Sequence, residues 1–572
     1  MRNSYINALL LIVIFLVGCG ESTVSIEDLV AKGGKKYGGE FRFMSSEKIS
    51  TFIPTYTADQ YSSRVVSQIF EPLLTYKGAD LEVVPAVAES YTVSDDGTEY
   101  TFKIRKGILF HDDPCFSDKD RTLTAADVKF TLDLACSGLE ENQVSYILKN
   151  RIEGAAAFFE KSKKSLPKSG VSGITVVDDY TVRIKLTNEV RSFERIIAHI
   201  GLGIMSKVAY DAYSKNLNDH PIGTGPFAFT SKSAEKIVLT RNPEYWKKDD
   251  FGNQLPFLEK VVLTYSQNKR SELLAFRKGE VDMVLEIPVD EINNILGSLK
   301  DAQEGKNIKH KVDTKKSLNV NYIATAIESD EFSDVQVRQA FNHAINRTEI
   351  VDKYLQGEGW AATAGFVPEM ADYDNTKIKG PAYNPEMART LLARAGYPNG
   401  KGFPTLDFYV NGKEGSSEHI SAKAVAKQLK EVLNVNLNVK LCTIDERRIA
   451  VANGTAKIWR AGWIADYPDP DNFLNLFHSG NANGKSSMVN SFNFRNDEFD
   501  RLYEASQLEN NPAKRNSLLQ QCDQIIVDQA PVFPILTDDH IVMLNARVRN
   551  FEANSMESIY LGDVFIKELK KN

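Results

Sequence analysis

The sequence predicts an α/β fold, because helical and strand patterns alternate along the chain. One clear instance is the segment 421–441, where the helical stretch SAKAVAKQLKEVL is followed by NVNLNVKL. In the second stretch every other residue from Val435 to Leu441 is apolar, which is the period of a strand with one buried side. A helix that runs directly into a strand is typical of layered α/β proteins.

Two further elements are predicted between residues 99 and 135. Every other residue of 100–104 is apolar, which indicates a strand. Thr124 stands where its hydroxyl can accept from the backbone N–H of Asp127 and so begin a helix.

Another helix is expected to begin at Ser333, because Ser333 and Gln336 have the spacing of a capping box. It carries an apolar stripe at helical spacing. The stripe consists of Val337, Ala340, Phe341, Ala344 and Ile345. No internal repeat suggests a solenoid.

Length and charge narrow the classes of protein. At 572 residues the chain is expected to form more than one domain. Its net charge of -7 and pI near 5.8, with Lys and Arg scattered along the chain, argue against a nucleic-acid partner.

The N-terminus has the form of an export signal. The apolar run at residues 8–17 follows the basic residue Arg2 and is too short to span a bilayer, so residues 1–18 are predicted to be a signal peptide. The sequence LVGC that ends at Cys19 resembles a bacterial lipobox, and Cys19 is therefore the expected lipidation site. Residues 19–37 suit a tether to the membrane. An uncleaved apolar anchor is the alternative.

Export places the remaining cysteines in a compartment that permits disulfides. Cys115, Cys136, Cys442 and Cys522 are even in number, and their pairing stays open. We favour a bridge between Cys115 and Cys136, which flank one short stretch, and we consider Cys442 with Cys522 as the second. No CxxC or His-rich spacing indicates a metal site, and no cofactor is expected.

Several motifs occur together and in order. They are IFEPLLTY at 69–76, AESYTVSDDGTEYTFKIRKGILFHDD at 88–113 followed by LTAADVKFTL, IGTGPF at 222–227, LTRNPEYW at 239–246, FRKGEVDM at 276–283 and VRQAFNHAINR at 337–347. Together they resemble the family 5 extracellular solute-binding proteins, the peptide-binding components of ABC importers.

The resemblance implies a bilobed periplasmic-binding-protein fold of type II with an extra inserted domain, whose two lobes close about a hinge. The implied segments are 38–74, 206–311 and 529–572 for lobe I, 75–205 for the inserted domain and 312–528 for lobe II. The glycines of IGTGPF are interpreted as structural.

The stretch RAGWIADYPDPDNFL at 460–474 is the main candidate for ligand binding. Every peptide offers an amine, a carboxylate and a uniform backbone, so a receptor for varied peptides must hold those parts. The resemblance implies that Asp466 clamps the amine and Arg460 the carboxylate. Gly462 would leave the backbone open for pairing, Trp463 would wall a side-chain pocket, and Ala465 lies beside them.

Structural interpretations of the same residues stay open. Asp466 could cap the following turn, Arg460 could form a surface salt bridge, and Trp463 could pack between the lobes. Asp469 and Asp471 are interpreted as turn residues, because the run lacks the Gly and terminal Glu of a calcium loop.

The opposite wall is expected from the resemblance at Thr57, Ala58, Asp59 and Gln60. Ala58 stands where oligopeptide-binding relatives can carry an acidic residue, so this sequence departs from theirs at that position. Trp360, in a glycine-rich connection, borders the site in relatives, and core packing is its alternative role.

The predicted function is capture of short peptides and delivery to a membrane permease driven by separate ATPase subunits. The protein is expected to be a monomer, exported and held by lipid at the periplasmic or cell-surface face. No HExxH, GxSxG or GxxxxGK[ST] motif supports an enzyme, and His111 is interpreted as structural. An oligosaccharide, nickel chelate or haem remains the alternative solute, and a secreted hydrolase the alternative class.

Overall fold

The structure is a computed structural model that describes residues 30–116, 120–285, 287–291, 295, 310–370, 373–482 and 489–567. The predicted signal peptide, Cys19 and the first part of the tether lie outside the described residues. Within the described part of the chain, no helix is long and apolar enough to cross a membrane.

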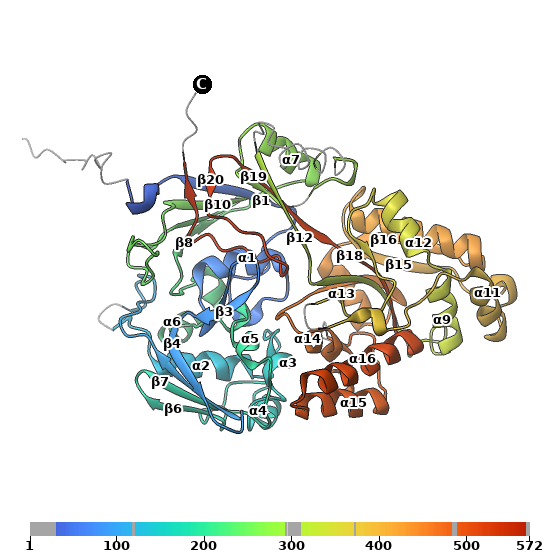
Figure 1. The fold of residues 1–572 in the computed structure, drawn as a ribbon, viewed down its shortest axis with the longest axis horizontal. Helices are drawn as coiled ribbons and strands as arrows, with labels where there is room; N and C mark the ends of the chain where they lie inside the picture. Colours follow the sequence, from blue (N-terminus) through green and yellow to red (C-terminus); the bar gives the residue numbers. More distant parts are fainter. Residues whose placement is uncertain are drawn as a thin grey trace, which may run out of the picture.

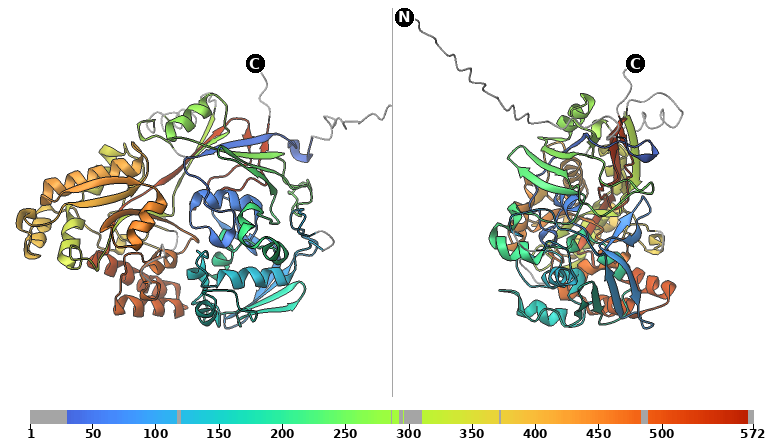
Figure 2. Two further views of the ribbon diagram at one scale, coloured as in Figure 1. Left: turned by 180° about the vertical axis from the view of Figure 1, so that it is seen from behind. Right: turned by 90° about the vertical axis from the view of Figure 1, so that its left-hand side faces the viewer.

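The molecule has two lobes that lie side by side, one coloured blue to green and the other yellow to red (Figure 1). Lobe I is built on a four-stranded sheet with α1 (Gln60–Ile69) beside it. The strands, in sheet order, are β1 (Glu40–Ser45), β10 (Lys260–Tyr265), β9 (Lys236–Arg241) and β8 (Phe227–Lys232). Seen from behind, the red C-terminal strands return to this lobe (Figure 2).

The inserted domain is a four-stranded antiparallel sheet packed against α2 (Ala125–Ala135). Its strands, in sheet order, are β4 (Ala88–Val93), β5 (Glu99–Ile104), β7 (Thr181–Lys185) and β6 (Ile174–Asp178). The strand prediction is confirmed, because Tyr100, Phe102 and Ile104 are all buried. The cap prediction is also confirmed, since Thr124 and Asp127 form a capping box at the start of α2.

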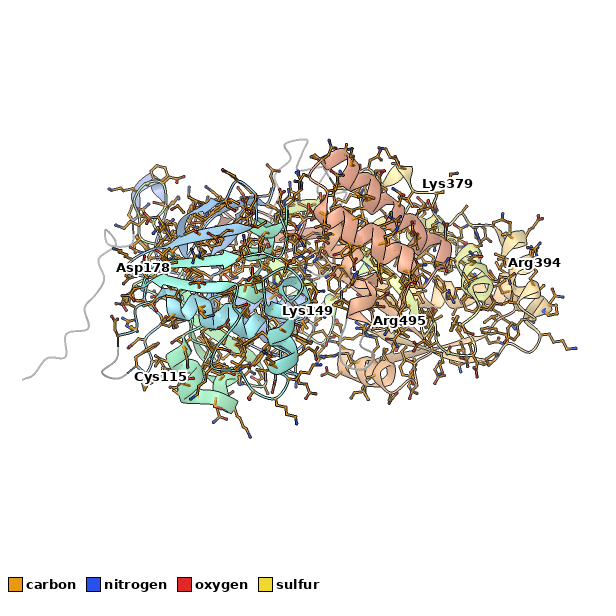
Figure 3. All side chains as sticks on the ribbon, turned by 90° about the horizontal axis from the view of Figure 1, so that it is seen from below. Cys115, Lys149, Asp178, Lys379, Arg394 and Arg495 are labelled. Carbon is orange, nitrogen blue, oxygen red and sulfur yellow. The ribbon has the colours of Figure 1, made fainter. Side chains whose placement is uncertain are left out.

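The short helices of the inserted domain complete its fold. They are α3 (Ser145–Leu148), α4 (Ala155–Lys161) and α5 (Phe193–Ile197), and the hairpin β2 (Leu74–Lys77) and β3 (Glu82–Pro85) precedes them. Seen from below, Lys149 and Asp178 of this domain lie in one half of the molecule, and Lys379, Arg394 and Arg495 lie in the other (Figure 3).

Lobe II is built on a six-stranded sheet. Its strands, in sheet order, are β14 (Trp360–Ala361), β18 (Val532–Thr537), β13 (Asn319–Thr325), β17 (Ile458–Ile464), β15 (Leu406–Asn411) and β16 (Leu437–Cys442). Its helices include α9 (Val335–Ala344), α11 (Pro385–Arg394), α12 (Ser417–Leu433), α13 (Ile444–Ala452), α15 (Asp497–Leu508) and α16 (Pro512–Gln529). β15 runs parallel to both of its neighbours, as expected of an α/β layer.

The predicted helix after residue 333 is confirmed, with one correction. All five residues of the apolar stripe are buried. The N-cap, however, is Asp334 and not Ser333, because the Asp334 carboxylate accepts from the backbone N–H of Gln336 at 2.8 Å. Asp is as effective a cap as Ser, so the pattern fixed the helix but not its first residue.

Two crossings of the chain join the lobes. β12 (His310–Lys316) and β19 (Asp539–Asn545) belong to a three-stranded sheet with β11 (Met283–Val284), whereas β13 and β18 belong to lobe II. The chain therefore passes between lobes at residues 317–318 and at Asp538, and Figure 1 shows these strands at the centre of the molecule. We take the two crossings as the hinge.

The IGTGPF segment lies in the interior of lobe I. A Cβ on Gly223 would collide with the carbonyl oxygen of Ile69, and one on Gly225 would lie 2.6 Å from that of Gln68. His111 hydrogen-bonds Gly225 O through Nε2 at 2.9 Å, and burial lowers the pKa of His111 to about 4. No residue of 222–227 lines the cavity described below.

Replacing Gly223 by Ala is expected to lower the free energy of unfolding by about 1–3 kcal/mol, the usual range for overpacking. Chemical denaturation measures this loss. An unchanged denaturation midpoint would contradict the close backbone approach described here.

Neither predicted disulfide is formed in the structure. Cys136, Cys442 and Cys522 are thiols. Cys136 is buried at the end of α2, and Cys522 is buried in α16 with its Sγ directed at Phe499 O, 3.7 Å away. Cys442 ends the edge strand β16. These three thiols lie in different elements of the fold, so the even number of cysteines in the sequence did not indicate that they pair.

Candidate functional site

A cavity of about 1780 Å³ lies between the two lobes, and residues of lobe I, the inserted domain and lobe II all line it. Nine of the predicted site residues line this cavity. They are Thr57, Ala58, Asp59 and Gln60 from lobe I, and Arg460, Gly462, Trp463, Ala465 and Asp466 from lobe II.

Trp360 is the exception. It is 56% exposed and is not among the residues that line the cavity. Its Nε1 donates to Asp539 Oδ1 at 3.0 Å, outside the core. Both interpretations made from the sequence, cavity wall and core packing, are therefore wrong for Trp360.

Asp466 lies where the inserted domain meets lobe II. Its Oδ2 accepts from the Tyr146 hydroxyl and from Asn472 Nδ2 at 2.9 Å. His199 Nε2 lies 3.5 Å from Oδ1, and His199 Nδ1 accepts from Gly201 N, so Nε2 carries the hydrogen. Each carboxylate oxygen has two acceptor positions, so Oδ2 is saturated while Oδ1 can accept one more donor.

The surroundings keep Asp466 ionised. Burial alone would raise the pKa of Asp466, but the hydrogen bond and charge of His199, with Asn472 and Tyr146, lower it overall. The turn that follows is capped by Asp469, which accepts from Asp471 N at 2.9 Å. Asp466 is therefore not the cap of that turn, and its carboxylate is available at the cavity wall.

Asp469 and Asp471 differ from each other. Asp469 begins α14 (Pro470–Leu474), as expected of a turn residue, and pairs with Arg515 at 2.8 Å. Asp471 is fully buried and pairs with Arg151 of the inserted domain at 2.7 Å. The turn interpretation is wrong for Asp471, which joins the lobes through a buried ion pair.

Further donors complete the environment of Asp471. Tyr467 donates its hydroxyl at 2.8 Å, Gln507 donates Nε2 at 3.0 Å, and Tyr503 also donates its hydroxyl. Burial acts to raise the pKa of Asp471, but the charges of Arg151 and Arg515 outweigh it and lower the pKa. The Asp471 carboxylate is thus well supplied with donors, whereas on the other side of the contact Arg151 Nε is buried without a hydrogen-bond partner among the residues that the structure describes.

Arg460 lies in a row of polar groups that crosses the sheet of lobe II. Its Nη2 donates to Asn321 Oδ1, and Asn321 Nδ2 donates to Asp538 Oδ2 at 2.5 Å. Arg460 is partly buried and forms no ion pair within 4 Å in the described part of the chain, so it is not the surface salt-bridge partner considered above, although its charge acts on the nearby carboxylates of Glu418 and Asp538. Its positive charge faces the cavity.

Arg447 of α13 supports Arg460. Its Nη1 donates to Arg460 O at 2.7 Å and to Asn411 Oδ1 at 2.9 Å. Burial, and then the charge of Arg460, lower the pKa of Arg447 to about 10. Asn411, at the end of β15, and the N-terminal end of α13 both border the cavity, as is common at the carboxyl ends of parallel strands.

One edge of β17 is open beside the cavity. β17 pairs with β13 along its whole length, but with β15 only at residues 458 and 459. The Arg460 carbonyl points away from β13 toward Arg447. Because backbone groups alternate along an antiparallel ladder, Gly462 presents its N–H and C=O in the same direction. Gly462 is exposed, so an extended ligand can pair there.

Trp463 packs between the lobes and also lines the cavity. Its ring makes an edge contact with Tyr146 of the inserted domain at 6.0 Å. Its Nε1 donates to Asn472 Oδ1 at 2.8 Å, which fixes the indole.

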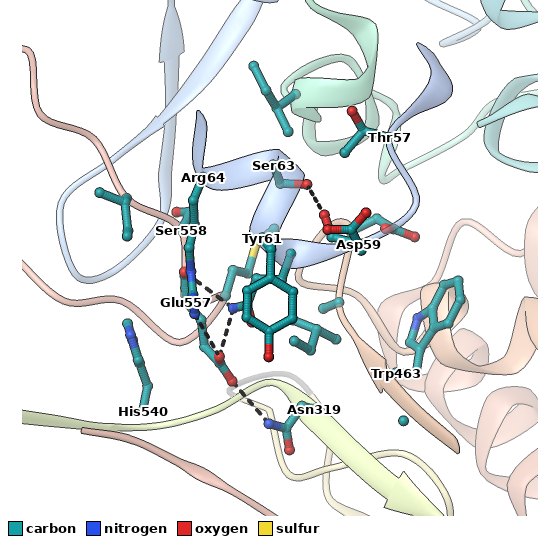
Figure 4. Close-up of a pocket in the computed structure, with 18 of the residues that line it drawn as sticks. Thr57, Asp59, Tyr61, Ser63, Arg64, Asn319, Trp463, His540, Glu557 and Ser558 are labelled. Atoms are coloured by element: carbon teal, nitrogen blue, oxygen red, sulfur yellow. Dashed lines mark hydrogen bonds and ion pairs between the residues drawn. The ribbon is translucent and has the colours of Figure 1, made fainter. Parts of the chain in front are cut away.

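The lobe I wall is formed by α1 and the residues before it (Figure 4). Asp59 caps α1 by accepting from Ser62 N at 2.8 Å, and Gln60 Nε2 donates to Glu557 Oε2 at 2.7 Å. Thr57 Oγ1 donates to Ile53 O at 2.9 Å. These side chains build the wall, and Ala58 is the exposed residue of the four.

Several charged residues of the cavity were not predicted. They include Arg447, Glu418, Glu358, Asp538 and Lys413. Burial acts to raise the pKa of Glu418, but the charges of Lys269 and Arg460 lower it to about 2. These residues come from separate segments without a shared motif, so nothing in the sequence indicated that they meet.

A cavity between two hinged lobes, lined by both and bordered by an open strand edge, defines a binding protein for a solute enclosed by lobe closure. Comparison with known proteins identifies the family of this binding protein. The chain belongs to the bacterial extracellular solute-binding proteins, family 5, whose middle region matches residues 82–485. This confirms the resemblance found in the motifs.

Two curated relatives cover most of the chain. Heme-binding protein A of Haemophilus influenzae is 28% identical over 549 residues, which is 94% of this chain and 94% of the relative. Di/tripeptide-binding protein 1 of Pseudomonas aeruginosa is 26% identical over 521 residues, 89% of this chain and 90% of the relative.

Solved structures confirm the bilobed fold. The periplasmic binding protein DppA from Helicobacter pylori, in complex with the peptide STSA, superposes with a TM-score of 0.79 at 24% identity. The superposition covers 93% of this chain and 99% of that protein. The Haemophilus influenzae OppA complex with RPPGFSPFR gives a TM-score of 0.80 at 22% identity. This superposition covers 93% of this chain and 99% of that protein.

Proposed function

We propose that this protein captures short peptides between its lobes and delivers them to the membrane permease of an ABC importer. The observation that carries the proposal is the arrangement along β17: the Arg460 guanidinium, an open backbone edge at Gly462, and the Asp466 carboxylate all border one cavity. A peptide offers a carboxylate, a backbone and an amine in the same order.

The distance along the strand limits the peptide length. Six residue-to-residue steps of nearly extended chain lead from Arg460 to Asp466, which corresponds to about 20 Å. An extended ligand with its ends at these two charges therefore has at most about six residues. The large cavity leaves room for varied side chains and for water.

The proposal includes the cellular setting. Cys19 receives lipid and holds a monomer at the outer face of the cytoplasmic membrane or in the periplasm, near the permease and its ATPase subunits. It is supported by the family's description as extracellular and by the apolar run before Cys19. Labelling with a fatty-acid analogue, lost in Cys19→Ser, measures the anchor.

Haem is a second candidate, because a relative of 28% identity is named for binding haem. Its propionates would find positive charge at Arg460 and Arg447. The peptide is preferred, since the Asp466 carboxylate and the open strand edge serve an amine and a backbone that haem lacks.

Calorimetry with unlabelled alanine peptides of two to six residues tests the function. We expect binding that is tightest at one length, with the peptides recovered unchanged afterwards. Hydrolysed peptides would indicate an enzyme instead. Absence of peptide binding, together with a Soret shift on adding haemin, would replace the proposal by the second candidate.

A further inference from the structure

One carboxylate of the cavity wall has no hydrogen-bond or ion-pair partner in the part of the chain that the structure describes. Glu358 lies just before β14 and lines the cavity, and its Oε2 is buried without a donor. A buried carboxylate without a partner is costly, so its retention calls for an explanation.

The backbone holds Glu358 in place. Gln356, Gly357 and Gly359 all have positive φ, at 54°, 84° and 82°. A Cβ on Gly359 would lie 2.5 Å from the carbonyl oxygen of Thr537 at the end of β18. The tight turn therefore presses against β18, and Glu358 is not on a loose loop.

The charges around Glu358 are mostly negative. The charges of Glu418 on α12, Asp538 after β18 and Asp539 on β19 act on it, as does that of Lys269, which begins α7 (Lys269–Arg277) and also lines the cavity. Burial raises the pKa of Glu358 to about 7, Lys269 opposes this rise, and the three acids add to it. Lys269 Nζ also donates to Ser417 Oγ at 3.4 Å.

We propose that Glu358 binds a positively charged side chain of the ligand, so that the protein prefers peptides that contain Lys or Arg. The inference rests on the proposed peptide function. An ammonium or guanidinium in the cavity would supply the donors that Oε2 lacks and would balance the local acids.

Geometry separates this subsite from the peptide ends. In the sheet order, β14 is three strands from β17, a distance of about 14 Å. This distance exceeds the reach of a Lys or Arg side chain, so the ligand residue that contacts Glu358 has its backbone in the cavity nearer to β14 and not at the open edge of β17. Within the described residues no three His, Cys, Asp or Glu side chains form a group that could hold a metal, which favours an organic cation.

A matched pair of peptides tests the inference by calorimetry at pH 8. Ala-Lys-Ala and Ala-norleucine-Ala differ in the terminal ammonium group. We expect the wild type to bind the Lys peptide at least tenfold more tightly, and Glu358→Gln to lose this preference while its affinity for the norleucine peptide changes less than threefold. Glu369→Gln, which removes an exposed carboxylate outside the cavity that pairs with Lys316 at 2.8 Å, should keep the preference.

The pH dependence provides a second readout. The Lys preference requires ionised Glu358, so it should weaken several-fold between pH 8 and pH 5.5 in the wild type, whereas Glu358→Gln shows no such trend. An equal preference in Glu358→Gln, or no preference in the wild type, would overturn the inference. If neither peptide binds any variant, the proposed peptide function fails instead. Thermal unfolding confirms that each variant is folded.

Discussion

Replacing Arg151 by Met is expected to shift the protein strongly toward its open form. Arg151 and Asp471 are buried at the contact between the inserted domain and lobe II, 2.7 Å apart. Loss of Arg151 breaks this buried ion pair in the closed form, which costs about 3–5 kcal/mol, although the charge of Arg515 still acts on Asp471. Opening lets water reach that carboxylate, so the cost falls on the closed state.

Small-angle scattering of the ligand-free protein measures this shift as a larger radius of gyration, and calorimetry measures it as weaker peptide binding. Arg195→Met is the matched control, because Asp469 lies 3.7 Å from Arg195 but keeps Arg515 at 2.8 Å. The double change Arg151→Met with Asp471→Leu should restore closure, since an apolar pair leaves no unpaired charge. Equal scattering by wild type and Arg151→Met would contradict this role.

Replacing Asp466 by Asn is expected to weaken binding of peptides with a free amine at least tenfold. The ligand amine would lose a charge-assisted hydrogen bond at Oδ1, the oxygen with an open acceptor position. Because Asn has the same shape, Asn472 and Tyr146 keep an acceptor nearby. N-acetylated peptides should bind the wild type and Asp466→Asn equally weakly, which calorimetry can measure.

Tyr146→Phe controls for the contact between lobes at this position. It removes the hydroxyl that donates to Asp466 but retains the carboxylate, so sensitivity to acetylation should persist. A dissociation constant unchanged in Asp466→Asn would contradict the role of Asp466 as amine clamp. An equal loss of affinity for free and acetylated peptides in Asp466→Asn would contradict it as well.

The secondary-structure elements were predicted from local patterns, whereas the ligand-binding roles of residues 460–466 were implied by the family resemblance and stay predictions. The apolar stripe after Asp334 and the alternation in β5 follow from period alone. The run from Arg460 to Asp466 stood out because it places an arginine, a tryptophan and an aspartate within seven residues, shortly before two prolines.

The contact between lobes left no such pattern. Arg151 and Asp471 are 320 residues apart in the chain, and Asp471 follows a proline, as a turn residue would. Only the folded chain shows that it is buried against another domain. Pairing over such separations is set by topology, which local spacing does not encode.

The glycine-rich connection before β14 shows the same limit. The sequence directed attention to Trp360, which is the large residue there, whereas Glu358, two residues earlier, lines the cavity. The direction of each side chain depends on the positive φ angles of this turn. Those angles are allowed by the glycines but are not determined by them.

Native mass spectrometry of the protein purified from its own cells tests the central claim most directly. The account predicts a bound adduct that fragments into a short series of amino-acid residues with an unmodified amine at one end. An adduct with the mass of haem or of a saccharide would contradict it.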